Sequence, residues 1–295
     1  IVPEGLTSPQ LSFNFTIRKN KIGVINMNAP VTFMDWVVFL LKKYGTYFLQ
    51  GCETTLILAL IGTFFGCIIG LLVGVLRTIP KPGRDKNIFI KALYKILQFL
   101  LLAYIEIFRG TPMMVQAMVL FYGSMQLFNI NMTPLFAGFF VVSVNTGAYM
   151  AETVRGGIES VDKGQTEAAE AIGMTHWQTM TSVILPQTFR NILPQIGNNL
   201  IINIKDTSVL NVISVTELYF NGKSAAGVYY RYFETYFIIS VFYFIMTFIC
   251  ARLLRWIEHK IDGSDYYQLA DPMNDPSGTL PDKKKTKGVM RAWLR

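Results

Sequence analysis

Long stretches without a charged residue recur along the chain, and they predict helices that cross a membrane. Residues 54–76 contain 23 uncharged positions in a row, and residues 110–151 contain 42. A bilayer core of about 30 Å needs roughly 20 mostly apolar residues in a helix. The first stretch therefore fits one crossing, and the second fits two crossings separated by the turn-rich residues 129–134.

This pattern predicts an all-α integral membrane protein with five crossings. They are residues 54–76, 96–124, 133–154, 191–216 and 235–251. The fourth crossing is the least apolar, because it contains Pro194, several Asn and the neighbours Lys205 and Asp206. Such residues are tolerated in a membrane where they face other helices or a cavity. Two adjacent charges on one helix point in different directions, so we expect each to have its own partner elsewhere in the protein.

Lysine and arginine are unevenly distributed over the loops, and this predicts the orientation. The loop after the first crossing contains six cations and one acid, and more cations follow the last crossing. Both places should be cytoplasmic, which puts the N-terminus outside and residues 158–190 inside. Residues 31–50 have too short an apolar part to cross, so they are predicted to form an interfacial helix. A sixth crossing there is the alternative, and it would invert the N-terminus.

The chain therefore divides into three parts. Residues 1–50 form an extracytoplasmic N-terminal segment with the interfacial helix, and residues 51–255 form the five-span domain, which includes residues 158–190. Residues 256–295 form a cytoplasmic tail, whose lysine cluster suits contact with anionic membrane lipid.

Composition agrees with a membrane protein and argues against other classes. The chain is 52% hydrophobic and 16% charged, unlike soluble domains, which contain about 25% charged residues. The net charge of +8 is explained by the cytoplasmic loops, and no platform of basic and aromatic residues predicts nucleic-acid binding. Three separated Cys and two His predict neither a disulfide framework nor a metal site. No sequence motif of a catalytic site is present.

Residues 158–190 read as two short helices on the cytoplasmic side. The first is predicted from Gly164 to Ile172 and ends at Gly173, a residue that adopts the left-handed conformation easily. Thr175 and Gln178 have the spacing of a capping box, which predicts a second helix that ends near Pro186. Small or apolar residues on one face of the first helix suit docking of another protein, although the loop could also fold on itself. They are Ala168, Ala169 and Ile172.

Several motifs in this part of the chain follow one another in an order that resembles a known family. Glu167-Ala168-Ala169, Gly173 and Val183-Ile184-Leu185-Pro186 resemble the EAA signature of ABC importer permeases, with Val183 in place of Ile. Motifs around it resemble the polar amino acid permeases of the histidine/glutamine/arginine type. They include Arg109-Gly110-Thr111-Pro112, Asn145 with Gly147-Ala148-Tyr149, and Lys205-Asp206-Thr207-Ser208. The resemblance covers roughly residues 51–260.

This resemblance implies the fold of a type I importer transmembrane domain, with five helices and a cytoplasmic coupling helix. Because the family carries the same pair, it also implies a break in the helix at Lys205-Asp206. It implies a second permease subunit, identical or paralogous, a separate ATPase dimer that binds ATP and Mg²⁺, and an external binding protein that delivers an amino acid. Residues 158–190, here named the coupling segment, would dock on the ATPase. The implied docking residues are Glu167, Ala168, Ala169, Ile172 and Gly173. The implied location is the bacterial cytoplasmic membrane.

ATP binding by the chain itself is not predicted, and no cofactor is expected in it. Gly222-Lys223-Ser224 resembles the end of a phosphate-binding loop, but Glu217 occupies the position where that loop needs Gly. The chain is therefore not expected to be an enzyme. The alternative function is a channel or secondary transporter that works without ATP.

Polar residues inside the predicted crossings are candidates for the substrate path. Amide and phenol groups suit the amino and carboxyl groups of an amino acid, but they equally suit hydrogen bonds between helices. The candidates are Thr111, Gln116, Asn145, Tyr149, Asn199 and Asn203. Glu106 and Arg109 are three residues apart, which favours a structural ion pair; the alternative places Arg109 near the substrate path. Four glycines spaced by four, from Gly62 to Gly74, predict a close helix contact.

Overall fold

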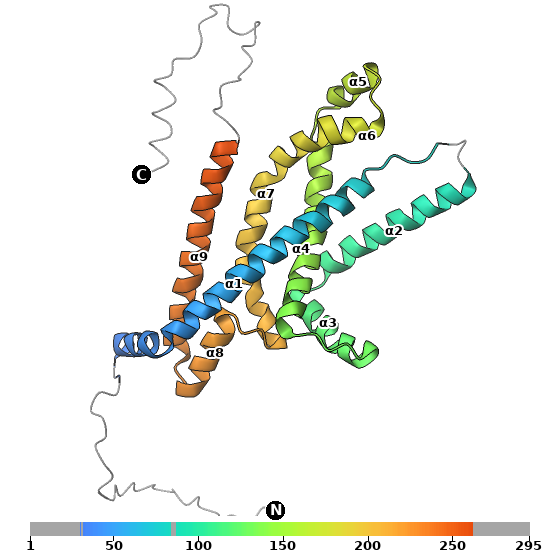
Figure 1. The fold of residues 1–295 in the computed structure, drawn as a ribbon. Coiled ribbons are helices and arrows are strands. Elements are labelled where there is room, and N and C mark those ends of the chain that lie inside the picture. The colour runs from blue at the N-terminus through green and yellow to red at the C-terminus, as the bar shows by residue number, and fades with distance from the viewer. Residues whose placement is uncertain (1–29, 31, 84–86, 262–295) are drawn as a thin grey trace, which may run out of the picture.

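The computed structural model describes residues 30, 32–83 and 87–261, and in this part of the chain all regular structure is helical (Figure 1). The predicted all-α class is therefore confirmed. The α-helices are α1 Phe33–Arg77, α2 Ile88–Gly110, α3 Met113–Phe128, α4 Pro134–Glu159, α5 Lys163–Ala171, α6 His176–Thr179, α7 Leu185–Asp206, α8 Leu218–Tyr229 and α9 Tyr232–Ile261. A π-helix, η1 Met180–Ile184, joins α6 to α7, and a 3₁₀-helix, η2 Thr207–Ile213, follows α7.

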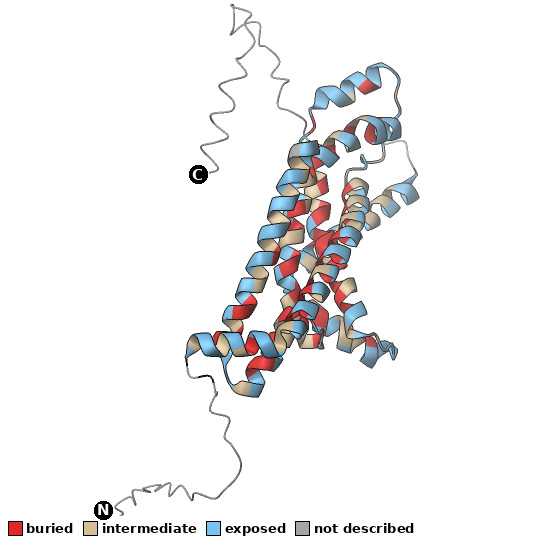
Figure 2. Ribbon diagram, turned by 60° about the vertical axis from the view of Figure 1, so that its left-hand side comes forward, coloured by how far each residue is buried: buried red, intermediate tan, exposed pale blue. Residues whose placement is uncertain are grey.

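The predicted interfacial helix and the first crossing form one uninterrupted helix, α1. It begins at a capping box in which Thr32 and Asp35 bond to each other's backbone N–H groups. A straight helix of 45 residues would be about 68 Å long, more than twice the thickness of a bilayer core. Figures 1 and 2 show that the first turns instead lie across the direction of the rest. There Lys43 donates a hydrogen bond to the Tyr229 hydroxyl of α8.

The glycine stripe on α1 lies directly against α4, as predicted. A Cβ atom added at Gly66 would lie 2.6 Å from Cβ of Thr146, and one added at Gly74 would lie 2.7 Å from Cβ of Val154. Added Cβ atoms at Gly62 and Gly70 would overlap Val142 and Met150 in the same way. The missing side chains therefore allow the α1 and α4 backbones to approach closely, which gains dispersion contacts that helices in lipid depend on.

The predicted second crossing, residues 96–124, is wrong as a single helix. The chain forms α2, which starts earlier at Ile88, and then breaks before α3 begins at Met113. Thr111 has φ −117° and ψ 145°, the extended conformation that the following Pro112 favours. Figure 1 shows α3 leaving the direction of α2 after this break. α3 ends at Asn129 with φ 55°, and Thr133 caps α4, so the predicted turn at 129–134 is confirmed.

The predicted fourth crossing corresponds to α7 followed by η2, with different limits. α7 begins at Leu185 rather than at residue 191, and its α-helical part ends at Asp206. The expected break near Lys205 and Asp206 is present, because the chain changes there from α-helix to 3₁₀-helix. Four described helices are long and apolar enough to cross a membrane: α1, α2, α4 and α9. α7 packs against α1, α4 and α9 and completes the bundle.

The segment that resembles a phosphate-binding loop is helical. Gly222 is buried in α8, where an added Cβ atom would overlap the Ile239 side chain of α9. Glu217 caps α8, since its buried carboxylate accepts hydrogen bonds from the backbone N–H groups of Tyr219 at 2.9 Å and Phe220 at 2.7 Å. The Tyr243 hydroxyl of α9 donates to the same carboxylate at 2.8 Å. These residues join α8 to α9 and are not arranged to bind phosphate.

The glycine contact gives a first prediction. Gly70→Ala should destabilise the protein by about 1–3 kcal/mol, the usual effect of overpacking, because the new methyl group meets the backbone of Met150 as well as its side chain. The measurement is the thermal unfolding midpoint of the purified full-length protein in detergent. Gly45→Ala is the matched control on the same helix, because nothing lies within 4 Å of an added Cβ atom there. Equal midpoints for the two variants would contradict the close contact.

Candidate functional site

The break between α2 and α3 leaves a backbone carbonyl without its helical partner. The Phe108 carbonyl would accept from the N–H of residue 112 in a continuous helix, but Pro112 has none. Two side-chain amides take its place: Nε2 of Gln116 donates to the Phe108 oxygen at 2.9 Å, and Nδ2 of Asn145 donates at 3.1 Å. Inside a membrane such a group must be satisfied by the protein itself. The two amides therefore make the break tolerable.

A cavity of about 470 Å³ opens beside this break, between α2, α3, α4 and α7. Five of the six predicted substrate-path residues line it: Thr111, Asn145, Tyr149, Asn199 and Asn203. The sixth, Gln116, does not line the cavity. It donates to both oxygens of Thr111 at 2.9 Å and accepts from Asn145 at 3.0 Å, so it supports two lining residues.

Several of these amides also join helices, which was the other interpretation of the sequence. Nδ2 of Asn203 donates to the hydroxyls of Thr63 at 2.8 Å and Thr146 at 3.0 Å, so α7 is bonded to α1 and α4 at one point. Nδ2 of Asn199 donates to the Gln195 carbonyl at 3.0 Å within α7. Both Asn residues are buried. The Nδ2 groups of both residues therefore donate their hydrogen bonds within the helix bundle, although both residues border the cavity.

Two charged residues border the cavity, one from α2 and one from α7. The Arg109 guanidinium lies over the Tyr149 ring, 5.5 Å from its centre, and Asp206 lines the α7 wall. Within the described residues no ion pair joins Arg109 to Glu106, so the interpretation of these two residues as a structural pair is wrong. The alternative interpretation, which put Arg109 beside the substrate-path candidates, agrees with its place in the cavity lining.

An ion-pair network lies further along α4, beyond Tyr149. Glu152 accepts from Arg77 of α1 at 2.6 Å and from Arg155 at 2.9 Å, and Arg155 also binds Glu159 at 2.6 Å. The Glu152 and Arg77 side chains are about one-fifth exposed, so they are only partly screened by solvent. The network joins the ends of α1 and α4 next to the coupling segment.

The coupling segment forms a hairpin at the end of the molecule opposite α3 and α8 (Figure 1). Asp162 caps α5, and Gly173 has φ +83°, the left-handed conformation predicted for the end of this helix. The predicted capping box is also present, since the Thr175 N–H donates to Oε1 of Gln178 at 2.8 Å and the Gln178 N–H donates to the Thr175 hydroxyl at 3.4 Å. The local sequence therefore determines both turns of the hairpin.

The five predicted docking residues do not all face outward. Glu167, Ala168, Ile172 and Gly173 are exposed, and the Ile172 side chain is 79% exposed. Ala169 is only 4% exposed and faces the inside of the hairpin, so the expected common face of Ala168, Ala169 and Ile172 is wrong. Trp177, which the sequence analysis did not single out, is 66% exposed at the start of α6. No periodic pattern could reveal it, because α6 is only four residues long.

The prediction that the second helix of the coupling segment ends near Pro186 is wrong. α6, η1 and α7 follow one another without a gap, so a helical path runs from His176 to Asp206. Pro186 lies in the first turn of α7, where a missing N–H is tolerated after the wider π-helical turn. The coupling segment is thus joined directly to the helix that carries Asn199, Asn203 and Asp206.

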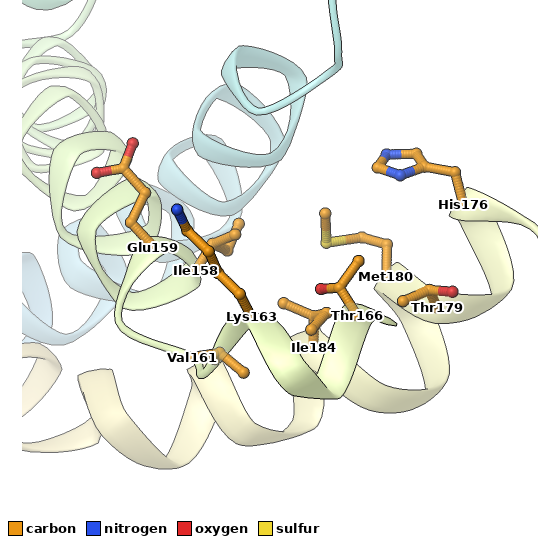
Figure 3. A pocket seen from close by; sticks show the side chains of 9 residues that line it. All are labelled: Ile158, Glu159, Val161, Lys163, Thr166, His176, Thr179, Met180 and Ile184. Atoms are coloured by element: carbon orange, nitrogen blue, oxygen red, sulfur yellow. The ribbon is translucent and has the colours of Figure 1, made fainter. Parts of the chain in front are cut away.

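The inside of the hairpin is partly hollow. Val161, Met180 and Ile184 form a small apolar cluster, next to a cavity of about 240 Å³ between the end of α4, α5 and α6 (Figure 3). The Thr179 hydroxyl is buried without a hydrogen-bond partner in the described part of the chain. The hairpin therefore has its own core, which leaves its outer face available for another protein.

Comparison with known proteins identifies the family. Residues 88–263 match the binding-protein-dependent transport system inner membrane component family. The chain belongs to this family. Its relatives include the glutamine transport system permease protein GlnP of Escherichia coli (strain K12), 36% identical over 214 residues, which cover 72% of this chain and 92% of that protein. The probable amino-acid permease protein YxeN of Bacillus subtilis (strain 168) is 34% identical over 230 residues, covering 77% and 96%.

A solved structure supports the same conclusion at the level of the fold. A chain in the crystal structure of an amino acid ABC transporter with histidines is 35% identical and superposes with a TM-score of 0.66, covering 79% of this chain and 100% of that chain. The type I importer fold and the family resemblance are therefore confirmed. The permease is a multi-pass membrane subunit of an ABC importer, and its family consists of membrane subunits rather than catalytic ones.

The broken helix gives a second prediction. Gln116→Leu should lower the free energy of unfolding by about 1–3 kcal/mol, because one amide donor to the Phe108 carbonyl is lost. Pro112→Ala supplies a backbone N–H for the same carbonyl, so the double variant should lose less than the sum of the two single variants. Unfolding midpoints of the four proteins in detergent measure this coupling. Strict additivity would show that the amide and the proline act independently.

Proposed function

We propose that the permease forms part of the path of an ATP-driven importer for polar amino acids. The observation that carries this proposal is the cavity beside the Pro112 break, whose α7 wall is continuous with the coupling segment. A ligand in the cavity and a protein bound to the coupling segment would thus contact the same helical path. A channel that works without ATP would not need a continuous helix between its cavity and a surface that docks another protein.

The chemistry of the cavity fits a zwitterion. The Asp206 carboxylate of α7 suits an ammonium group, and the Arg109 guanidinium of α2 suits a carboxylate. The Tyr149 hydroxyl and the amide oxygens of Asn145 and Asn199 suit a polar side chain. A volume of about 470 Å³ lies within the usual range of small-molecule pockets. The relatives that carry glutamine or other amino acids support this substrate class.

The energy would come from an ATPase dimer that holds ATP and Mg²⁺ and docks on the coupling segment. Its contact would include Glu167, Ala168, Ile172 and Gly173, and we add Trp177 because of its exposure. The small side chain of Ala169 would contribute from inside the hairpin, because it lets α5 pack closely against the apolar cluster there. Movement of the docked ATPase would then move α7 and expose the cavity to each side of the membrane in turn.

The same proposal includes two further proteins. A second permease, identical or paralogous, would complete the path, and an external binding protein would deliver the amino acid. We place the N-terminus outside and the C-terminus and coupling segment inside a bacterial cytoplasmic membrane. The cations near the ends of α1 and α9 support this orientation, because both helices end on the side of the bundle where the coupling segment lies (Figure 1). Arg77 is the last residue of α1 and Lys81 follows it, while Arg252 and Arg255 belong to the last turns of α9.

Transport by the reconstituted complex tests the proposed substrate. The complex that copurifies with this chain is placed in vesicles with its binding protein, and ATP hydrolysis and uptake are measured with each amino acid in turn. One chemical group of polar amino acids should raise both rates. Asp206→Asn should raise the substrate concentration for half-maximal uptake about tenfold or more, through loss of a charge-assisted hydrogen bond.

Lys205→Gln is the matched control, since this exposed neighbour does not line the cavity. It should leave uptake close to that of the unchanged protein. Uptake that continues without ATP, or a complex that contains no ATPase, would overturn the proposed function. Equal effects of the two variants would overturn only the role of Asp206.

Docking of the ATPase gives a separate prediction. Ile172→Glu should reduce the amount of ATPase that copurifies at least about tenfold, because an exposed apolar contact becomes charged. The matched control is Ile130→Glu, the same change at an exposed position between α3 and α4, at the other end of the molecule. Quantitative immunoblotting of the purified complexes measures the ratio of the two proteins. An unchanged ratio for Ile172→Glu would exclude this face as the docking surface.

A further inference from the structure

A second hollow lies on a different side of α7 from the cavity and has no role in the proposed transport path. It is a groove of about 400 Å³ between α1 and α7, with α4 as its floor. Met150 and Val154 of α4 form the floor, and they are buried together with Ile192 of α7. Exposed side chains form the rims, among them Phe64 on α1 and Phe189 on α7.

The groove is apolar along its whole length. Among the residues that line the groove, Thr63 and Cys67 carry a polar group. The Thr63 hydroxyl already accepts a hydrogen bond from Asn203 at 2.8 Å. Along α1 it extends from Leu60 to Leu71, which corresponds to about 16 Å of helix. One leaflet of a bilayer core is about 15 Å thick, half of the whole. The groove therefore matches one leaflet in both length and chemistry.

A cation lies at one end of this groove. Arg190 directly follows Phe189 and lies one helical turn before Leu193, and both of those residues line the groove. Arg190 is exposed and has no ion-pair or hydrogen-bond partner within residues 30, 32–83 and 87–261. It also borders a separate hollow of about 290 Å³, together with Ser182 and Gln187. This end of α7 therefore offers a free guanidinium beside space for a ligand group.

We propose that the groove binds one anionic phospholipid in the leaflet next to the coupling segment. One acyl chain lies between α1 and α7 over Met150 and Val154, and the phosphate of the headgroup is bound by Arg190. The apolar lining favours an acyl chain, and the Arg190 guanidinium favours a negatively charged headgroup through charge-assisted hydrogen bonds. This proposal does not depend on which substrate the permease carries.

Charge favours a lipid over a second copy of the chain as the occupant. The protein has a net charge of +8, and α9 ends on the side of the bundle where α7 begins (Figure 1). Arg252, Arg255 and Lys260 belong to the last turns of α9, and Arg190 belongs to the first turns of α7. A second copy placed in this groove would bring further cations close to Arg190, at a cost in repulsion. An anionic headgroup neutralises Arg190 instead.

Retention of a defined lipid tests the proposal. The full transporter complex is purified in mild detergent from vesicles that contain equal amounts of phosphatidylglycerol and phosphatidylcholine, and bound lipid is counted by native mass spectrometry. The unchanged protein should keep one phosphatidylglycerol per chain. Arg190→Gln should weaken its retention about tenfold, the effect of losing one charged hydrogen bond.

A second variant tests the groove separately from the headgroup. Leu193→Trp fills the groove and should abolish retention of the lipid, whereas Ile249→Trp, at an exposed position on α9, should not. Arg252→Gln is the matched control for charge, since Arg252 is exposed on α9 away from the groove. Amino acid uptake is measured on the same samples, so that a loss of bound lipid can be distinguished from a failure of the proposed transport function.

Three outcomes would overturn the proposal. The unchanged protein could keep no lipid, it could keep phosphatidylcholine as readily as phosphatidylglycerol, or Leu193→Trp could change the number of permease chains in the complex and leave the bound lipid unaltered. The last result would assign the groove to a second permease chain.

Discussion

The structure depends on a constraint that a membrane imposes on the backbone: a carbonyl that loses its helical partner must be satisfied by another part of the protein. Pro112 removes the N–H that the Phe108 carbonyl would use, and the amides of Gln116 and Asn145 replace it. Since Asn145 lies on α4, this repair also fixes the break against a second helix. The cavity is located beside this break because the chain cannot be helical there, and because the residues that satisfy the backbone are polar.

Close packing on the other side of α4 makes this arrangement rigid. The four glycines of α1 bring its backbone against Val142, Thr146, Met150 and Val154, so α1 and α4 behave as one unit. Asn203 then bonds to Thr63 and Thr146 across that contact and attaches α7 to both helices. These bonds concern a single turn of α7. The rest of α7 is held mainly by apolar contacts, which can be exchanged for others at lower cost than a buried hydrogen bond.

The sequence predicted the features that depend on local chemistry. Charge-free stretches indicate the crossings, and the spacing of Thr175 and Gln178 together with the position of Gly173 predicts the turns of the hairpin. It failed where a residue's role depends on distant neighbours. Ala169 and Ala168 are adjacent and chemically identical, yet only the packing of α5 on the hairpin core decides which one is buried. Pro186 predicts the end of a helix, because proline inside a helix lacks the N–H that the preceding turn would bind. The π-helical turn before it lets the helix continue, and nothing in the residue pattern indicates such a turn. The spacing of Glu106 and Arg109 favours an ion pair, whereas the guanidinium lies over the Tyr149 ring of α4, which is far away in the sequence. The five cavity candidates came together because polar residues inside a membrane have few other places to face.

Two sides of α7 border different hollows, and the geometry of the helix connects them. Asn199, Asn203 and Asp206 share the side that borders the cavity, while Phe189, Leu193 and Leu200 share the side that borders the apolar groove, about a quarter turn away. A rotation of α7 that changes the cavity must also change the width of the groove against α1. Because α6 and η1 continue directly into α7, the same rotation reaches the coupling segment. A ligand that binds one position of α7 more tightly than another shifts the population toward that position, whichever of the three sites it occupies. The cavity, the groove and the outer face of the coupling segment are therefore linked through one helix, and a bound phospholipid would influence transport by the same physical route as a bound ATPase.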